Sequence, residues 1–228
     1  MSLRITWHGH ATWAIQTSKH SLIIDPFFDH NPAATIPAAQ VKADFLLVSH
    51  GHSDHIADAA SIANRCGATV VSNYEITSWL AKEHGVKNVV GGNLGGGVDL
   101  PFGRVKLTLA HHSSALPDGS NGGNPCGFLL TIEGKKLYFA CDTGLFYDMK
   151  LIGAVGLDLA VLPIGDLFTM GPDDALEAVK LLAPKKVVPS HFNTWPPIAQ
   201  DGAAWAARVK KEIGCEAVSL KPGETMEV

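Results

Sequence analysis

Apolar residues in the first fifty positions recur in short runs that are either continuous or alternate with polar residues, as in β-strands. Gly, Asn and Pro interrupt these runs, which is typical of turns. The run ADFLLVSH is apolar almost to its polar end, which is typical of a strand buried on both faces. The pattern predicts strands within 4–9, 12–17, 21–28 and 43–50.

Segments of helical composition alternate with further apolar runs along the rest of the chain. The pattern predicts helices at 56–67, 74–85, 172–184 and 202–214, most of which end at a glycine. It predicts strands at 68–73, 104–112, 157–166, 185–192 and within 216–228, and a hairpin over 127–142 that turns at Glu133–Gly134. The glycine-rich stretches 91–97 and 116–125 are predicted to be irregular, and the loop 117–125 is a candidate mobile lid.

Polar residues follow four of the apolar strands, and at these positions the two halves of the chain show a weak internal similarity. LIIDP and LLVSH in the first half resemble LYFACDTG and VVPSH in the second half. In open α/β sheets, sites form at such strand ends. Two similar halves that face each other would bring the four strand ends into one cleft. The alternative is that a sequence similarity this short arose by chance.

The composition narrows the class of protein. With 228 residues, of which 46% are hydrophobic, the chain predicts one domain over residues 1–228 with a sizeable core. The formal net charge is −4, and no basic run marks a nucleic-acid or membrane surface. A nucleic-acid partner and a membrane are therefore not expected. A phosphorylated substrate stays open, because a metal ion can supply the positive charge.

The cysteines and the N-terminal segment predict a cytoplasmic location. Cys66, Cys126, Cys141 and Cys215 form no C-x-x-C pair, which favours reduced thiols. The first residues, MSLRITWHGHATW, contain no long apolar signal segment. No stretch approaches the length of a membrane span.

The segment SHGHSDH at 49–55 places three histidines and an aspartate directly after a buried strand. His50 and His52 point to the same side of an extended backbone, and Asp54 and His55 lie where the chain turns into the predicted helix. Imidazole and carboxylate ligands suit Zn, Mn or Fe. Four ligands exceed the need of one catalytic ion, which keeps an open position, so the surplus indicates two ions. The alternative is a polar loop of solvated histidines.

The motif H-x-H-x-D-H after an apolar strand resembles the signature of the metallo-β-lactamase fold superfamily. Within it, the chain resembles the UPF0173 metal-dependent hydrolases, relatives of the ascorbate-6-phosphate lactonases. The resemblance covers nearly the whole chain, through ITWHGHATWAI, IIDPFF, HHSS, CDTG, PIGDLFTMGPDDA and PSHFNTWP. It implies an α/β (α+β) fold, the four-layer αββα metallo-β-lactamase sandwich, with two mixed sheets face to face and the metal site at one edge.

The resemblance also implies a cofactor of two divalent metal ions, Zn or Mn in the first place, with Ni or Fe also compatible. It assigns His50, His52 and His112 to one ion and Asp54, His55 and His191 to the other, with Asp142 and a hydroxide bridging them. His111 is the rival of its neighbour His112, and alternation along 104–112 would send the two side chains to opposite faces.

Further residues are candidates for supporting roles. His10 resembles a histidine that lactonase-like relatives keep near the metal site, where it would polarise substrate or move a proton, against a purely structural role. Asp54 would also orient the hydroxide or take its proton. Asp25 is a candidate for an acceptor that holds a ligand imidazole in its tautomer, against a turn-capping role before Pro26. Asp166 is a candidate for the same role or for the substrate edge, against a role in its loop. Asn193 and Trp195 would shape the substrate wall.

These features predict an enzyme, a metal-dependent hydrolase that cleaves an ester, lactone or phosphoester bond of a small molecule through a metal-bridging hydroxide. An iron-dependent oxidoreductase on the same fold, a nuclease-type phosphodiesterase and a non-catalytic metal-binding protein are the rivals. Exposed apolar strands would allow a homo-oligomer, but no pattern in the sequence gives a number of subunits.

Overall fold

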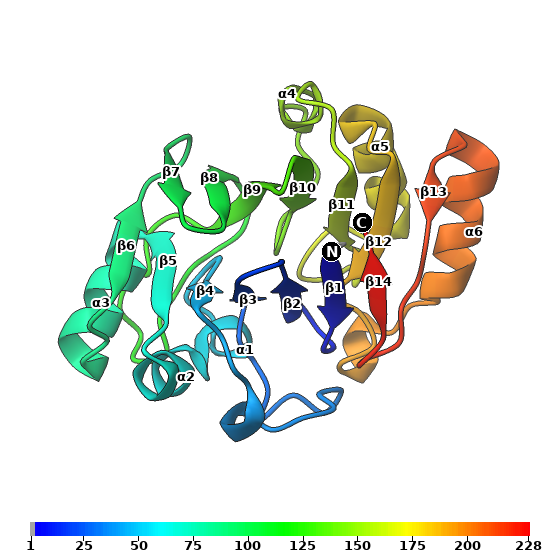
Figure 1. Ribbon diagram of the computed structural model, residues 1–228. Coiled ribbons are helices and arrows are strands. Elements are labelled where there is room, and N and C mark those ends of the chain that lie inside the picture. Colours follow the sequence, from blue (N-terminus) through cyan, green and yellow to red (C-terminus); the bar gives the residue numbers. More distant parts are fainter. Residues whose placement is uncertain (1–2) are drawn as a thin grey trace.

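Two seven-stranded mixed sheets pack face to face in the computed structural model, which describes residues 3–228, and helices cover their outer faces (Figure 1). The first sheet has the order β14-β1-β2-β3-β4-β5-β6, and the second has the order β13-β12-β11-β10-β9-β8-β7. This arrangement confirms the predicted αββα sandwich. In the described part of the chain, no helix combines the length and the apolar character needed to cross a lipid bilayer.

The strands of each sheet come mainly from one half of the chain. The first sheet contains β1 (Arg4–Trp7), β2 (Trp13–Gln16), β3 (Ser21–Ile24), β4 (Phe45–Leu47), β5 (Thr69–Asn73), β6 (Val89–Gly92) and β14 (Thr225–Glu227). The second contains β7 (Gly97–Leu100), β8 (Gly103–Leu109), β9 (Cys126–Ile132), β10 (Lys135–Phe139), β11 (Leu159–Pro163), β12 (Lys186–Ser190) and β13 (Glu216–Ala217). The exception is β14, which pairs antiparallel with β1 and so brings the two ends of the chain together (Figure 1).

Within residues 3–228, six α-helices accompany the sheets: α1 (Ser53–Ile56), α2 (Ala59–Cys66), α3 (Tyr74–His84), α4 (Met149–Gly153), α5 (Pro172–Leu182) and α6 (Gly202–Ile213). Short 3₁₀ turns lie at Ala38–Gln40 and Pro196–Ile198. The side chains of Asn73 and Asp201 cap α3 and α6. Glycines in the left-handed conformation end both helices, and the sequence predicts these glycine ends.

The predicted helix over 56–67 is wrong at its start, because the structure has two short helices there. The helix begins earlier, so Asp54 and His55 lie in the first turn of α1. The break before α2 comes from Asp58, whose backbone N–H donates to the carbonyl of Pro26 and whose carboxylate accepts the N–H of Phe28. These long-range bonds compete with continuation of the helix.

The glycine-rich stretch 91–97 is more regular than the sequence predicts, whereas 116–125 is irregular as predicted. Residues 91–97 contain the end of β6 and the start of β7, where the chain passes from the first sheet to the second. The loop 117–125 is tied down rather than free, since the Asn73 amide donates to the carbonyls of Gly122 and Asn124, and the Trp79 indole donates to Asp118. The hairpin turn is confirmed: Glu133 and Gly134 both have positive φ, as in a type I′ turn.

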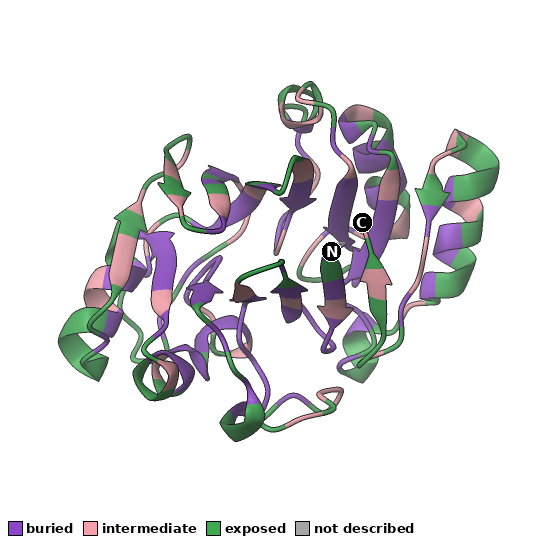
Figure 2. Ribbon diagram, viewed as in Figure 1, coloured by how far each residue is buried: buried purple, intermediate pink, exposed green. Residues whose placement is uncertain are grey.

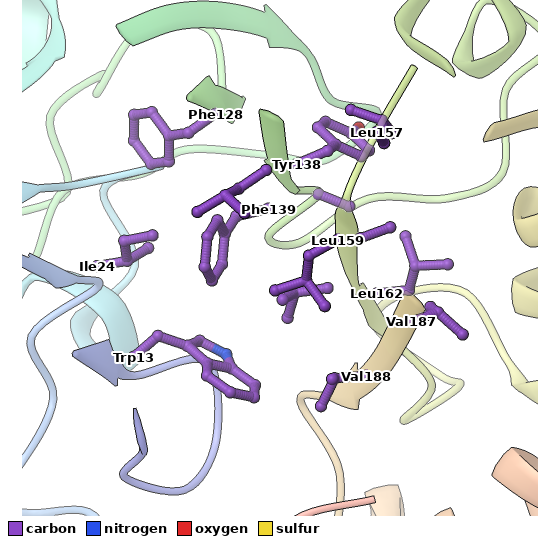
Figure 3. Packing of buried hydrophobic residues seen from close by; sticks show 14 of the residues in the cluster. Trp13, Ile24, Phe128, Tyr138, Phe139, Leu157, Leu159, Leu162, Val187 and Val188 are labelled. Atoms are coloured by element: carbon purple, nitrogen blue, oxygen red, sulfur yellow. The ribbon is translucent and has the colours of Figure 1, made fainter. Parts of the chain in front are cut away.

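Alternation along the central strands decides which side chains enter which core. Leu22, Ile24 and Leu47 face the second sheet, whereas Ile23 and Leu46 face the helices that cover the first sheet. Trp13 and Ile24 approach Phe128 and Phe139 across the gap between the sheets, which Figure 3 shows from close by. Most central strands are buried, and the exposed residues lie mainly on the outer faces of the helices and in the loops (Figure 2). This core holds the strand ends of the two sheets in fixed positions relative to each other.

Candidate metal centre

Polar side chains from both sheets meet where β1, β3, β4, β10 and β12 end. Asp25 follows β3, His50 and His52 follow β4, Asp142 follows β10, and His191 follows β12. The strands β3 and β4 are parallel to each other, as are β10, β11 and β12, so their carboxyl ends lie together in each sheet. The expectation that the ends of these four similar strands meet in one place is confirmed.

The first group of side chains that could hold a metal ion consists of His50, His52 and His112. Nε2 of His50 lies 2.9 Å from Nδ1 of His52, and Nε2 of His112 lies 3.3 Å from the same atom. Three imidazole nitrogens therefore converge on a small volume, in the manner of a three-histidine site. His111, the rival of His112, turns away and stacks its ring on Phe146 at 5.2 Å.

The second group consists of His10, Asp54, His55 and His191. Oδ2 of Asp54 lies 3.1 Å from Nε2 of His10 and 3.9 Å from Nε2 of His55. The His55 and His191 rings are nearly parallel, with centroids 5.7 Å apart. Carboxylate and imidazole in this ratio are suitable ligands for Zn or for Mn, Fe and Ni.

Asp142 lies between the two groups. Its Oδ2 atom is 3.0 Å from Nε2 of His191, 3.4 Å from Nε2 of His55 and 3.5 Å from Nε2 of His112. A buried carboxylate normally requires a compensating charge. Burial by itself would raise the pKa of Asp142, but His191 and His55 outweigh it and hold this pKa well below its usual range.

Asp25 supports the ligands from behind. Its Oδ1 accepts the backbone N–H of Ser49, and its Oδ2 accepts the Ser49 hydroxyl at 2.7 Å and lies 2.9 Å from Nδ1 of His55. Because a carboxylate only accepts, His55 donates its Nδ1–H to Asp25 and turns Nε2 toward Asp142. Ser49 Oγ lies 2.9 Å from Nδ1 of His50, so the same carboxylate orients His50 through the serine.

We expect the substitution Asp25→Asn to lower metal affinity by about 10–100-fold, because the amide fails to fix the His55 tautomer. Competition with a chromophoric chelator measures this affinity. Asp29→Asn is the matched control, since Asp29 is exposed and accepts the N–H of Ala38 away from the ligands. Unchanged affinity in a folded Asp25→Asn protein would contradict the supporting role.

His10 is fully buried and is held from both sides of its ring. Nε2 faces Asp54, Nδ1 lies 2.8 Å from the Thr194 hydroxyl, and the Trp195 ring packs edge-on at 5.0 Å. Burial, with a further contribution from His191, lowers the pKa of His10 to about 3, so the ring is neutral. The hydrogen bond from His10 and the nearby His55 outweigh the burial of Asp54 and keep the pKa of that carboxyl below its usual range. A neutral His10 then donates Nε2–H to Asp54 and accepts from Thr194.

Strained backbone accumulates around these side chains. Most non-glycine residues with positive φ lie at the strand ends of the site: His10, Asp25, Cys141, Asp166, Leu167, His191 and Asn193. Each such conformation costs roughly 1–3 kcal/mol and persists only where the surrounding fold imposes it. The strain therefore marks the residues whose direction the two sheets determine.

The unsatisfied polar atoms of the site fit a divalent cation. In the described part of the chain, His55 Nε2, Asp142 Oδ1 and His191 Nδ1 are buried atoms without a hydrogen-bond partner. Buried polar atoms are rarely left unpaired, and each costs about 1–3 kcal/mol. His55 turns its unpaired Nε2 toward Asp142 Oδ2, whereas His191 approaches the same oxygen with Nε2 and not with its unpaired Nδ1. Imidazole nitrogens and a carboxylate together are the donor set expected around metal ions.

Two of the predicted supporting residues lie elsewhere. Asp166 is wrong as a partner of a ligand imidazole: it is exposed, and its Oδ1 accepts the N–H of Leu167 within its own loop. Asn193 turns its Oδ1 to the N–H of Gln200 and lines a cavity behind the loop, beside Phe192. Both residues adopt left-handed backbone after a strand end, which directs them away from the cluster. Trp195, in contrast, lies against His10.

Sequence reasoning did not single out Ser49 and Thr194. Ser49 stands inside the motif SHGHSDH, so its neighbour His50 was a usable signal. Thr194 lies three residues after His191, but its contact with His10 spans 184 positions, and no local pattern indicates it.

The fold and the clustered imidazoles and carboxylates define the class of the protein, an αββα sandwich with a candidate metal centre at its strand ends. The beta-lactamase superfamily domain matches residues 20–192. A UPF0173 metal-dependent hydrolase from Thermus thermophilus is 48% identical over 226 residues, which are 99% of each chain. Another, from Pelotomaculum thermopropionicum, is 48% identical over 231 residues, 99% of this chain and 100% of the relative.

A solved structure is also similar over the full length. It is a metallo hydrolase from the archaeon Ignicoccus hospitalis, with 34% identity and a TM-score of 0.91 over 100% of this chain and 99% of the other. The chain belongs to the UPF0173 metal-dependent hydrolases of the beta-lactamase superfamily.

Proposed function

We propose that the protein hydrolyses an ester, lactone or phosphoester bond of a small molecule with two divalent metal ions. His50, His52 and His112 hold one ion, Asp54, His55 and His191 hold the other, and Asp142 bridges them. The observation that carries this proposal is the position of Asp142, whose Oδ2 lies within 3.5 Å of ligand nitrogens from both groups. Zn or Mn are the ions we expect first, and lactone or ester substrates the first to screen.

A bound pair of such ions lowers the pKa of water to about 7 and stabilises negative charge on the attacked and departing oxygens. The residues of this chain supply the remaining parts. Asp54 is ionised and partly exposed, so it can accept the proton of the attacking water. His10 holds Asp54 in place through Nε2–H, and Trp195 covers the outer side of His10.

The first test measures metal per chain by elemental mass spectrometry, on protein purified without chelators or a histidine tag. Two equivalents of Zn or Mn, followed by turnover on an ester, lactone and phosphoester panel, are the expected result. About one equivalent of iron with oxygen consumption would instead favour the oxidoreductase. Failure to bind metal after reloading would remove the ligand assignment.

The adjacent histidines at 111 and 112 offer a matched pair of variants. We expect His112→Ala to reduce turnover at least about a hundredfold and to lose metal from the first group, because ligands matter more than the residues that support them. His111→Ala is expected to keep the metal content and activity, since its ring stacks on Phe146. The reverse result, or equal losses in both, would contradict the assignment of His112.

A further inference from the structure

Three large apolar side chains are exposed in loops that follow β11 and β12. Leu167 is 66% exposed, Phe168 is 56% exposed and Trp195 is 37% exposed. Single exposed apolar residues are common on protein surfaces, but clusters of them frequently mark binding sites. Whether these side chains can contact a substrate depends on where they lie relative to the metal centre.

The loop that carries Leu167 and Phe168 packs directly against the candidate ligands. The Met170 N–H donates to the carbonyl of Thr143, the residue after Asp142, at 2.9 Å. At the other end of the loop, a Cβ on Gly165 would lie 3.3 Å from Nδ1 of His191 and would collide with its carbonyl. The loop therefore contacts the centre both beside Asp142 and beside His191. Trp195 contacts the centre through the ring of His10.

The backbone keeps these side chains on the surface. Asp166 and Leu167 both have left-handed φ, of 63° and 53°, and Asp166 Oδ1 accepts the N–H of Leu167. Left-handed backbone is costly for residues with a Cβ, and two in succession are rare. A fold that only needed to close this loop would place glycine there, so the conformation points to a use for the exposed apolar residues.

The segments at the strand ends contain no cation to receive an anionic group. The chain has 18 lysines and arginines, yet none of them falls in the segments 8–12, 25–37, 49–58, 110–125, 140–148, 164–171 and 191–201, all within the described residues. The same segments carry exposed carboxylates at Asp29, Asp118, Asp148 and Asp166. Along these segments, a phosphate or carboxylate remote from the reacting bond would meet acidic side chains and no arginine or lysine, which such groups normally require.

We infer that the substrate is an uncharged ester or lactone with an apolar acyl or alkyl group, and that Leu167, Phe168 and Trp195 contact this group. The inference rests on the proposed hydrolase function and narrows it. In the reaction, water adds its oxygen to the acyl carbon, the acyl C–O bond breaks, and the departing oxygen takes the proton. The three apolar side chains determine specificity and take no part in bond breaking.

Matched esters of 4-nitrophenol test the inference on metal-loaded protein. The hexanoate ester and the monoadipate ester have acyl chains of the same length, but only the second ends in a carboxylate. We expect kcat/KM to favour the hexanoate at least about tenfold. Phe168→Ala is expected to lower kcat/KM for the hexanoate by about five- to tenfold, as loss of an apolar contact does, and to lower it less for the acetate ester, whose acyl group is too short to fill the contact. Tyr74→Ala is the control, since Tyr74 is an aromatic residue on α3 that is 64% exposed, somewhat more than Phe168.

A binding measurement separates this inference from the proposed function. The ketones 2-octanone and 7-oxooctanoate differ only in a terminal carboxylate and cannot be hydrolysed. We expect 2-octanone, and not 7-oxooctanoate, to shift the indole N–H resonance of Trp195 in the nuclear magnetic resonance spectrum. Preference for the monoadipate, or for a phosphodiester, would overturn the inference and leave the hydrolase standing. If no ester is turned over, the hydrolase fails, and the ketone pair alone decides about the apolar ligand: no shift of Trp195 overturns it.

Discussion

Asp142→Asn protein is expected to lose at least one equivalent of metal and to hydrolyse responsive substrates at least about a hundredfold more slowly. The carboxylate is almost fully buried and lies within 3.5 Å of Nε2 of His55, His112 and His191. An amide has one acceptor oxygen and no charge, so it can neither bridge two cations nor compensate them. Elemental mass spectrometry and initial rates on the ester panel measure the two losses.

Asp148→Asn is the control for this variant. Asp148 lies six residues after Asp142, is exposed and precedes α4. The metal content and rates of the Asp148→Asn protein are therefore expected to equal those of the unchanged protein. An Asp142→Asn protein that keeps two equivalents and full turnover would refute the bridging role. A protein that loses metal but keeps turnover would refute the metal-dependent mechanism.

Removal of the metal is expected to lower the melting temperature by roughly 5–10 °C. A ligand that binds only the folded state at a hundred times its Kd contributes about 2.7 kcal/mol, and a chain of this size shifts by about 2–4 °C per kcal/mol. Without cations, buried atoms such as His55 Nε2 and Asp142 Oδ1 stay without partners. The loss therefore comes from the centre itself and not from the apolar core between the sheets.

Differential scanning calorimetry before and after dialysis against a chelator measures this shift, and reloading with Zn or Mn should reverse it. His112→Ala protein, which lacks one ligand, is expected to shift by less than the unchanged protein. His111→Ala should shift by the full amount. An identical melting temperature in chelated and reloaded protein would argue against a resident metal at these residues.

Local patterns were sufficient for the parts of the centre that lie close together in the chain. The spacing of His50 and His52 predicts side chains on one side, and their nitrogens lie 2.9 Å apart. Alternation after the strand at 104–112 separates the two neighbouring histidines, and only His112 joins the cluster. Both pairs lie just beyond the ends of β4 and β8, so the directions agree with the predictions although the strands stop before the histidines.

Contacts between distant segments were beyond these patterns. The break between α1 and α2 follows from the hydrogen bonds of Asp58 to the segment 26–29. The hydrogen-bond partner of His10 is Thr194, which lies 184 positions further along the sequence. Asp166 resembled a supporting residue by its place after a strand, yet left-handed backbone turns it outward. Residue type alone predicts none of these outcomes, because each side chain could form its hydrogen bonds with several alternative partners.

The sequence by itself determined the ligand types, the strands that end in them and, through the motif and its resemblance, the fold family. Only the tertiary structure decided which side chains share a site, because β3, β4, β10 and β12 come together through two sheets that pack face to face. It also decided that the loop carrying exposed Leu167 and Phe168 packs against Thr143 and His191, and that Trp195 lies against His10. Side-chain chemistry is a local property of the chain, whereas convergence depends on the packing of a core formed by residues far apart in sequence.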